Sequence, residues 1–351
     1  MRVIQALQAG GPDVLELVEL PTPVPGPGEL LVDVAAAGVN FIDTYRRAGV
    51  YPMAYPHVVG TEGAGVVTAV GPGVADFEPG DHVAWTNAFG SYAEQVVVPA
   101  DVAIPVPASV DLRVAAAVGL QGLTAHYLVT STYPVQPGDD VLLHAGAGGV
   151  GLLATQLAVR RGARVITTVS TEAKAELSRA AGASDVVNYA ELDDLTSELP
   201  AIVRDLTGGR GVAVVYDSVG KDTFEASLAS LRRRGMLVLF GGSSGQVPPF
   251  DLQRLNKGGS LFTTRPKLDD YTATRAELLD RASEVFALVA SGDLDVRVGA
   301  TFPLARAADA HRALEGRATT GKVLLVPDLE PGSDGVTGTG AASGPTTDPA
   351  P

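Results

Sequence analysis

The chain has 351 residues, 46% of them hydrophobic, which is enough for two domains with a substantial core in each. Its formal net charge of −14 repels phosphate backbones, so we expect no nucleic acid as a main partner, although a small basic pocket could still bind an anionic cofactor. The absence of cysteine excludes disulfides, thiolate nucleophiles and cysteine-ligated zinc. No signal peptide and no bilayer-long apolar stretch are apparent, so we expect a cytoplasmic protein without membrane contact.

Residues 1 to about 120 consist of short β-type runs separated by turn clusters rich in glycine and proline. Typical runs are RVIQALQ, VLELVEL, ELLVDVAAAGV and GAGVVTAV. This pattern predicts a compact β-rich domain.

After Gln121 the pattern changes to alternating strands and helices, which is typical of a parallel sheet covered on both faces. Six strands are expected, near 140–145, 164–169, 185–188, 212–217, 235–240 and 260–264. Between them, Thr171 or Ser170 can cap a helix that ends at Gly182, and Pro200 fits the first turn of another helix. Six parallel strands make a complete doubly wound α/β sheet.

The last part of the chain is expected to return to the first domain. A helix over 272–291, a strand RVGATF, a helix LARAADAHRALEG and a strand GKVLLVP do not extend the six-stranded sheet in an obvious way. We therefore predict a discontinuous domain of residues 1–123 plus 266–329 and a second domain of residues 124–265. Residues 330–351 are rich in Gly, Pro, Ser and Thr and are predicted to be a disordered tail.

The glycines at 146, 148 and 151 have the G-x-G-x-x-G spacing of a dinucleotide-binding loop. They follow an apolar strand and open a helical stretch, which is the context that the motif requires. Small residues there let the backbone approach a pyrophosphate at a helix N-terminus. The sequence therefore predicts a dinucleotide site.

The end of the second strand decides which dinucleotide is expected. NAD sites usually carry an acidic side chain there, whereas this chain has the neutral Ser170 and Thr171, with Lys174 one turn further on. An ammonium at Lys174 suits a 2′-phosphate, which favours NADPH. Glu172 complicates this interpretation, and Lys174 could instead be a solvated helix residue.

Several motifs together closely resemble the NADPH-dependent quinone oxidoreductases, the zinc-free branch of the medium-chain dehydrogenase/reductase superfamily that includes zeta-crystallin. They are AAAGVNFIDTYRRAGVYP, VVGTEGAGVV, AAAVGLQGLTAHYLV, HAGAGGVGLLATQLA, VVYDSVG and LFGGSSG. The resemblance covers about residues 1–327 and implies a Rossmann domain beside a β-rich GroES-like domain. Asn40 and Thr61 occupy positions where zinc-dependent relatives have a cysteine and a histidine ligand, so we expect no metal.

The resemblance also implies the site residues. A catalytic role is implied for Asn40, Asp43, Tyr45, Tyr51 and Thr61. Cofactor binding is implied for Asn40, Phe41, Tyr45, Thr124, Tyr127, Gly148, Gly149, Val150, Ser170, Thr171, Lys174, Tyr189, Ser218, Phe240, Gly241, Gly242, Ser243, Phe262, Thr263, Thr264 and Arg317. For Phe41 and Ile42, however, we favour a packing role, because their spacing also suits a core stripe.

Three functions follow from this interpretation. The leading hypothesis is reduction of quinones by transfer from the nicotinamide C4 of NADPH, without metal or flavin, because a quinone accepts electrons without a Lewis acid. An NADPH-dependent enone or alkenal double-bond reductase is the first alternative, and an NADPH-binding structural or RNA-binding protein is the second. The resemblance further suggests a homodimer joined edge to edge at LFTTRP.

Overall fold

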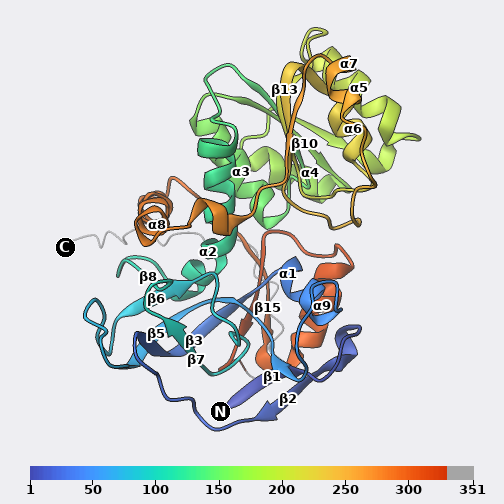
Figure 1. Ribbon diagram of the computed structural model, residues 1–351. Coiled ribbons are helices and arrows are strands. Elements are labelled where there is room, and N and C mark those ends of the chain that lie inside the picture. The colour runs from blue at the N-terminus through green and yellow to red at the C-terminus, as the bar shows by residue number, and fades with distance from the viewer. Residues whose placement is uncertain (330–351) are drawn as a thin grey trace, which may run out of the picture.

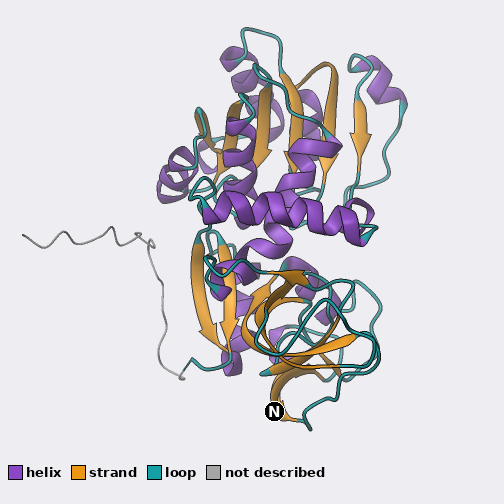
Figure 2. Ribbon diagram, turned by 90° about the vertical axis from the view of Figure 1, so that its left-hand side faces the viewer, coloured by secondary structure: helices purple, strands orange, loops and turns teal. Residues whose placement is uncertain are grey.

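The computed structural model describes residues 1–329, so the predicted tail 330–351 lies outside the described residues. The chain forms two bodies, one built on a parallel sheet and the other on mainly antiparallel strands (Figure 1). Figure 2 shows helices on both sides of the parallel sheet and further helices between the two bodies.

The parallel sheet has the strand order β11-β10-β9-β12-β13-β14. Its strands are β9 (Asp140–His144), β10 (Arg164–Val169), β11 (Asp185–Asn188), β12 (Val212–Asp217), β13 (Leu231–Leu239) and β14 (Phe262–Thr264). The predicted doubly wound sheet of six parallel strands is thereby confirmed. The order reverses between β9 and β12, and their carboxyl ends flank the crevice where open α/β sheets bind ligands.

Helices connect these strands as the alternating pattern predicts. They are α3 (Gly149–Arg160), α4 (Glu172–Ala180), α5 (Leu195–Leu206), α6 (Phe224–Ala229) and α7 (Gln253–Lys257). Thr171 caps α4, as predicted, because its hydroxyl accepts the Lys174 amide at 3.3 Å. The prediction for Pro200 is wrong: α5 begins earlier, where Asp194 accepts the Thr196 amide at 3.0 Å, and Pro200 lies inside the helix. The cap at Asp194 fixes the start of α5, and the burial of Leu199 and Val203 helps to offset the helical hydrogen bond that proline removes.

The second body contains a seven-stranded sheet and a small three-stranded sheet. The larger sheet has the path β15-β16-β3-β5-β6-β8, with β7 also paired to β3, and the smaller has the order β2-β1-β4. The strands are β1 (Arg2–Ala6), β2 (Leu15–Glu19), β3 (Glu29–Val39), β4 (His57–Val58), β5 (Glu62–Val70), β6 (His82–Trp85), β7 (Gln95–Pro99), β8 (Ile104–Pro105), β15 (Val298–Pro303) and β16 (Lys322–Val326). The helices of this body are α1 (Phe41–Arg47) and α9 (Ala307–Glu315). Since β16 pairs with β3, the end of the chain joins the sheet formed by its beginning.

The helix α2 (Leu112–Tyr127) joins the two bodies and is covered by α8 (Arg275–Ala290). One continuous hydrophobic cluster runs from Ala36 and Ala64 in the second body, through Ala115–Val118 of α2, to Val141 and Leu143 of the parallel sheet. Burial of this apolar surface holds the bodies together. A second link lies at the glycine loop, where the Gly321 amide donates to the Ala147 carbonyl at 3.0 Å. The crevice between the bodies is therefore bounded by packed elements on both sides.

Candidate active site

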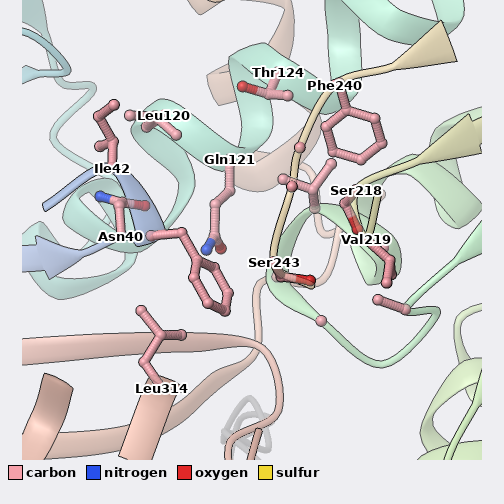
Figure 3. Close-up of a pocket in the computed structure, with 18 of the residues that line it drawn as sticks. Asn40, Ile42, Leu120, Gln121, Thr124, Ser218, Val219, Phe240, Ser243 and Leu314 are labelled. Carbon is pink, nitrogen blue, oxygen red and sulfur yellow. The ribbon is translucent and has the colours of Figure 1, made fainter. Parts of the chain in front are cut away.

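A cavity of about 880 Å³ lies between the two bodies, at the switch point of the parallel sheet. This volume is within the range of small-molecule and cofactor sites. Figure 3 shows its centre, where the Gln121 side chain extends from α2 between Asn40 and Ser243. Chain segments far apart in the sequence meet here, which is typical of a site built between two domains.

The glycine loop lies against this cavity and requires its small residues. A Cβ at Gly151 would lie 2.2 Å from the Ala145 carbonyl oxygen, and one at Gly146 would lie 2.6 Å from the Thr167 Cβ. A Cβ at Gly149 would meet only the end of the Gln121 side chain, 1.9 Å away. Gly146 and Gly151 thus allow the tight turn and the close packing of strand on helix, while Gly149 keeps the backbone at the start of α3 open toward the cavity.

One end of the cavity is built to receive an anion. The Lys174 ammonium donates to the Arg317 carbonyl at 2.9 Å and to the Ser170 hydroxyl at 3.3 Å. Ser170, Lys174, Tyr189 and Arg317 all line the cavity, as predicted. Thr171 is not among the lining residues, and its hydroxyl caps α4, so its contact with the cofactor stays a prediction.

Positive charge is concentrated around the cavity although the chain as a whole is acidic. The lining includes five cationic side chains, those of Arg46, Lys174, Arg265, Lys267 and Arg317. Among residues 1–329, the carboxylates that line it are those of Asp222 and Asp269. A cavity of this kind attracts anionic small molecules.

The other end of the cavity holds Asn40 in one orientation. The Asn40 amide nitrogen donates to Glu62 Oε2 at 2.6 Å, and its amide oxygen accepts from Lys322 Nζ at 2.8 Å. Glu62 and Lys322 also bond each other directly, and both are fully buried. The second Glu62 oxygen accepts the Leu120 amide at 2.6 Å, which ties this group to α2. Both ends of the Asn40 amide are thus used, so its direction is fixed.

Aromatic side chains form the wall next to Asn40. Phe41, Tyr45 and Tyr51 line the cavity, and the rings of Tyr45 and Tyr51 lie 6.1 Å apart. Burial raises the pKa of Tyr45, so its hydroxyl keeps its proton. The packing role that we favoured for Phe41 and Ile42 is wrong: both are only half-buried and face the cavity, while Asp43, Thr44 and Arg47 form the buried side of α1.

Asp43, for which a catalytic contact was predicted, does not line this cavity. It is fully buried and accepts the Asn40 backbone amide at 3.0 Å and the Tyr92 hydroxyl at 3.1 Å. Burial raises the pKa of Asp43 to about 6. The prediction of direct contact is corrected because the periodicity of α1 turns Asp43 away from the cavity that Asn40 and Tyr45 reach.

The cofactor contact predicted for the backbone of Phe262, Thr263 and Thr264 stays a prediction. These residues form the edge strand β14, where Phe262 is 56% exposed, and none of them lines the cavity. The chain reaches the cavity only after the strand has ended, at Arg265 and Pro266. The predicted end of this strand, at residue 264, agrees with the structure, and the residues that line the cavity are those that follow it.

The remaining predicted residues come together around the cavity. Besides those already placed, they are Thr61, Thr124, Tyr127, Gly148, Val150, Ser218, Phe240, Gly241, Gly242 and Ser243. Sequence reasoning missed Gln121, Arg46, Arg265 and the buried Glu62–Lys322 pair. Gln121 lies in the motif AAAVGLQGLTA, which was a usable signal, but no spacing reveals a pair of residues separated by 260 positions.

The positions that resemble a zinc site do not suit a metal. The Asn40 amide is fully used by Glu62 and Lys322, and the Thr61 hydroxyl accepts from Arg46 at 3.3 Å. Two cationic side chains beside the candidate ligands would repel Zn²⁺. Across residues 1–329, no group of three or more His, Asp or Glu side chains is arranged to hold a metal ion, and no helix in this range is long and apolar enough to span a membrane.

Comparison with known proteins agrees with this architecture. The alcohol dehydrogenase GroES-like domain matches residues 26–108, and the domain described as zinc-binding dehydrogenase matches residues 149–278. A mycobacterial protein solved as a complex with NADPH superposes with a TM-score of 0.90 at 52% identity, covering 93% of this chain and all of that one.

Two curated relatives are similar over nearly their whole length. Quinone oxidoreductase 1 of Escherichia coli is 47% identical over 322 residues, which cover 91% of this chain and 97% of the relative. The 2-haloacrylate reductase of a Burkholderia species is 44% identical and is covered to 96%. The chain therefore belongs to the quinone oxidoreductase family of the medium-chain dehydrogenase/reductase superfamily.

Proposed function

We propose that this protein reduces quinones with NADPH, without metal or flavin. The observation that carries the proposal is the single cavity in which an anion-binding end at Lys174 and Arg317 continues, past the glycine loop, into an aromatic end at Tyr45 and Tyr51. This order of features matches the two ends of a bound NADPH and a flat acceptor beyond it. The relatives named quinone oxidoreductase support the same activity.

The residues present fit NADPH. The open backbone at Gly148 and Gly149 suits the pyrophosphate, and the ammonium of Lys174 with the guanidinium of Arg317 suits the 2′-phosphate. When bound, NADPH supplies a hydride from its nicotinamide ring. An acceptor that is already easy to reduce then mainly needs positioning.

The chain supplies that positioning. Asn40, fixed by Glu62 and Lys322, presents its amide where the two bodies meet, and the rings of Tyr45 and Tyr51 offer stacking surfaces for a planar acceptor. Arg46, which lies over the Phe89 ring at 4.8 Å and donates to Thr61, places a positive charge near the acceptor end. Negative charge that develops on an acceptor oxygen would be stabilised there.

Reduction of an activated double bond is the second candidate function. The similarity to a 2-haloacrylate reductase favours it, and both reactions would use the same cavity and cofactor. They differ in the position that must be protonated after hydride transfer. The cavity does not support the structural or RNA-binding alternative, because its cationic side chains line the cavity.

Four finer points remain proposals. We assign residues 1–123 plus 266–329 to the GroES-like domain and 124–265 to the NADPH-binding domain. A homodimer joined at β14 is supported by the exposed Phe262 and Leu252, which an edge-to-edge contact would cover. The roles of the individual site residues, and a cytoplasmic location, are proposed from the sequence.

The proposed function is tested by steady-state oxidation of NADPH and of NADH by purified protein with a panel of benzoquinones and naphthoquinones. We expect turnover with several quinones and a clear preference for NADPH. Tight NADPH binding without oxidation by any quinone would contradict the proposal.

A further inference from the structure

Asp43 has one carboxylate oxygen with no hydrogen-bond partner among residues 1–329. Its Oδ2 accepts two hydrogen bonds, from the Asn40 amide at 3.0 Å and the Tyr92 hydroxyl at 3.1 Å. Its Oδ1 is buried and accepts none. A buried charged oxygen without a partner costs more free energy than a protonated one, and a protonated oxygen still needs an acceptor for its hydrogen.

A chain of hydrogen bonds determines which carboxyl oxygen of Asp43 has no hydrogen-bond partner. The Arg47 guanidinium, which can only donate, lies 3.0 Å from His311 Nδ1, so that nitrogen accepts. Burial and the charge of Arg47 lower the pKa of His311 to about 3, so the ring is neutral and carries its proton on Nε2. This proton is donated to the Tyr92 oxygen 3.2 Å away, and the Tyr92 hydroxyl therefore donates to Asp43 Oδ2. The chain runs in one direction and leaves Oδ1 as the only carboxyl oxygen free to hold a proton.

A second, small cavity is lined in part by Asp43. Its volume is about 10 Å³, which is close to the space that one buried water requires. Its lining includes Asp43, Arg46, Gly60 and Thr61. Arg46, Met53 and Thr61 also line the large cavity, so the small cavity adjoins its acceptor end.

We propose that Asp43 is the proton source for the reduction: it holds a proton on Oδ1 and delivers it, through one water in the small cavity and the Thr61 hydroxyl, to the reduced acceptor. The proposal rests on the proposed function. Hydride transfer brings two electrons and one proton to the acceptor, so a neutral hydroquinone needs one further proton. Thr61 gives its hydroxyl proton to the acceptor oxygen, the water replaces it, and Asp43 supplies the water. The Asp43 carboxylate then regains a proton from solvent by the same route after the product has left.

The charges around Asp43 are consistent with this role. Burial raises the pKa of Asp43, and the cations of Arg46 on α1 and Lys322 on β16, together with the bonds from the Asn40 amide and Tyr92, oppose that rise. Four other titratable groups lie near Asp43. Tyr92 and His311 are neutral, and Glu62 is paired with Lys322. His57 lines the small cavity. The net result is a carboxyl group whose pKa is raised to about 6, chiefly by burial.

Asp43→Asn tests the relay because it keeps an acceptor for Tyr92 and Asn40 but cannot pass on a proton. We expect its kcat with a benzoquinone to fall about 10- to 100-fold, with the KM for quinone and the Kd for NADPH unchanged. Wild-type kcat should decline as pH rises through about 6, and this decline should be absent in Asp43→Asn. Asp33→Asn, an exposed carboxylate whose partner is Gln95, is the matched control. Wild-type kcat with the same pH profile in Asp43→Asn would overturn the proposal.

Thr61 gives an independent test if Asp43→Asn does not fold. Thr61→Val removes the hydroxyl at nearly constant volume and should reproduce the loss of kcat, whereas Thr61→Ser should restore it. Equal turnover by the valine and serine variants would overturn the relay. If the proposed function itself were wrong, quinone turnover would be lacking in the wild type, the control and all variants alike. The kcat of the same variants would then be measured with an enone as the acceptor.

A readout without cofactor or turnover is provided by infrared spectroscopy of the protein alone. Lowering the pH through about 6 should produce a carboxylic-acid C=O band in the wild type that is missing in Asp43→Asn. Absence of that band from the wild type would overturn the assignment of Asp43 as the proton source.

Discussion

Lys174 Nζ donates to the carbonyl oxygen of Arg317 at 2.9 Å, and this bond joins the first turn of α4 to the segment that precedes β16. Arg317 holds a left-handed backbone conformation, with φ of 55°, and four residues later the Gly321 amide bonds the glycine loop. One short segment from the GroES-like body thus reaches both the anion-binding end and the phosphate loop of the other body. The same short segment therefore makes contact with the other body at two places along the cavity.

Replacing Lys174 with alanine should reduce the preference for NADPH over NADH. A charge-assisted bond contributes about 1.5–3 kcal/mol, so the ratio of kcat/KM values should fall about 10- to 100-fold. Lys257→Ala on the exposed helix α7 is a suitable control, because it removes a lysine that does not line the cavity. An unchanged preference in Lys174→Ala would remove the role assigned to this side chain.

Two glycines of the loop should respond differently to the same substitution. A methyl group at Gly151 meets the Ala145 carbonyl at 2.2 Å, so Gly151→Ala should destabilise the protein by about 1–3 kcal/mol. At Gly149 only the flexible end of Gln121 must move, so Gly149→Ala should keep the wild-type Tm. Thermal unfolding of both variants checks this contrast, and equal Tm values would show that the loop tolerates a side chain at either position.

The buried pair of Glu62 and Lys322 should be sensitive to the loss of one partner. Lys322→Met leaves a fully buried carboxylate without its cation and should cost about 3–5 kcal/mol. The double variant Glu62→Gln with Lys322→Met removes the unpaired charge, so its midpoint of urea unfolding should lie above that of the single variant. The opposite order would mean that the charge at Glu62 is solvated in some other way.

His311 should make the protein sensitive to acid. Its pKa is lowered from 6.5 to about 3 in the folded state, so between these values the unfolded chain binds the additional proton. Stability is therefore lost as pH falls from 6.5 towards about 3, by up to about 1.4 kcal/mol per pH unit. Relative to His311→Gln, the wild type should lose stability over this range. Asp43 acts in the opposite direction, because its raised pKa adds stability to the folded state as pH falls from about 6 to 3.8. This contribution cancels in the comparison, since both the wild type and His311→Gln contain Asp43. Parallel stability curves for the two proteins would contradict the burial of a neutral His311.

The sequence allowed much of the fold to be predicted, since the signals are local. The apolar runs of the six parallel strands, the glycine spacing and the cap at Thr171 each depend on residues close together in the chain. Pro200 was misplaced because a proline at a helix start and one inside a helix look alike unless the cap at Asp194 is weighed against it.

The site was predicted less completely, because its parts meet only in three dimensions. Lys322 reaches Asn40 across 282 positions, and nothing in either segment indicates the other. The orientation of α1 could not be predicted either, because the same apolar spacing suits a helix face packed in the core and one that lines a cavity. In the structure, Phe41 and Ile42 face the cavity.

This cavity should reduce quinones in preference to activated double bonds. We would measure kcat/KM with NADPH side by side for a benzoquinone and for a short 2-alkenone. We expect faster turnover of the quinone. Faster reduction of the alkenone would contradict that ranking and favour a double-bond reductase.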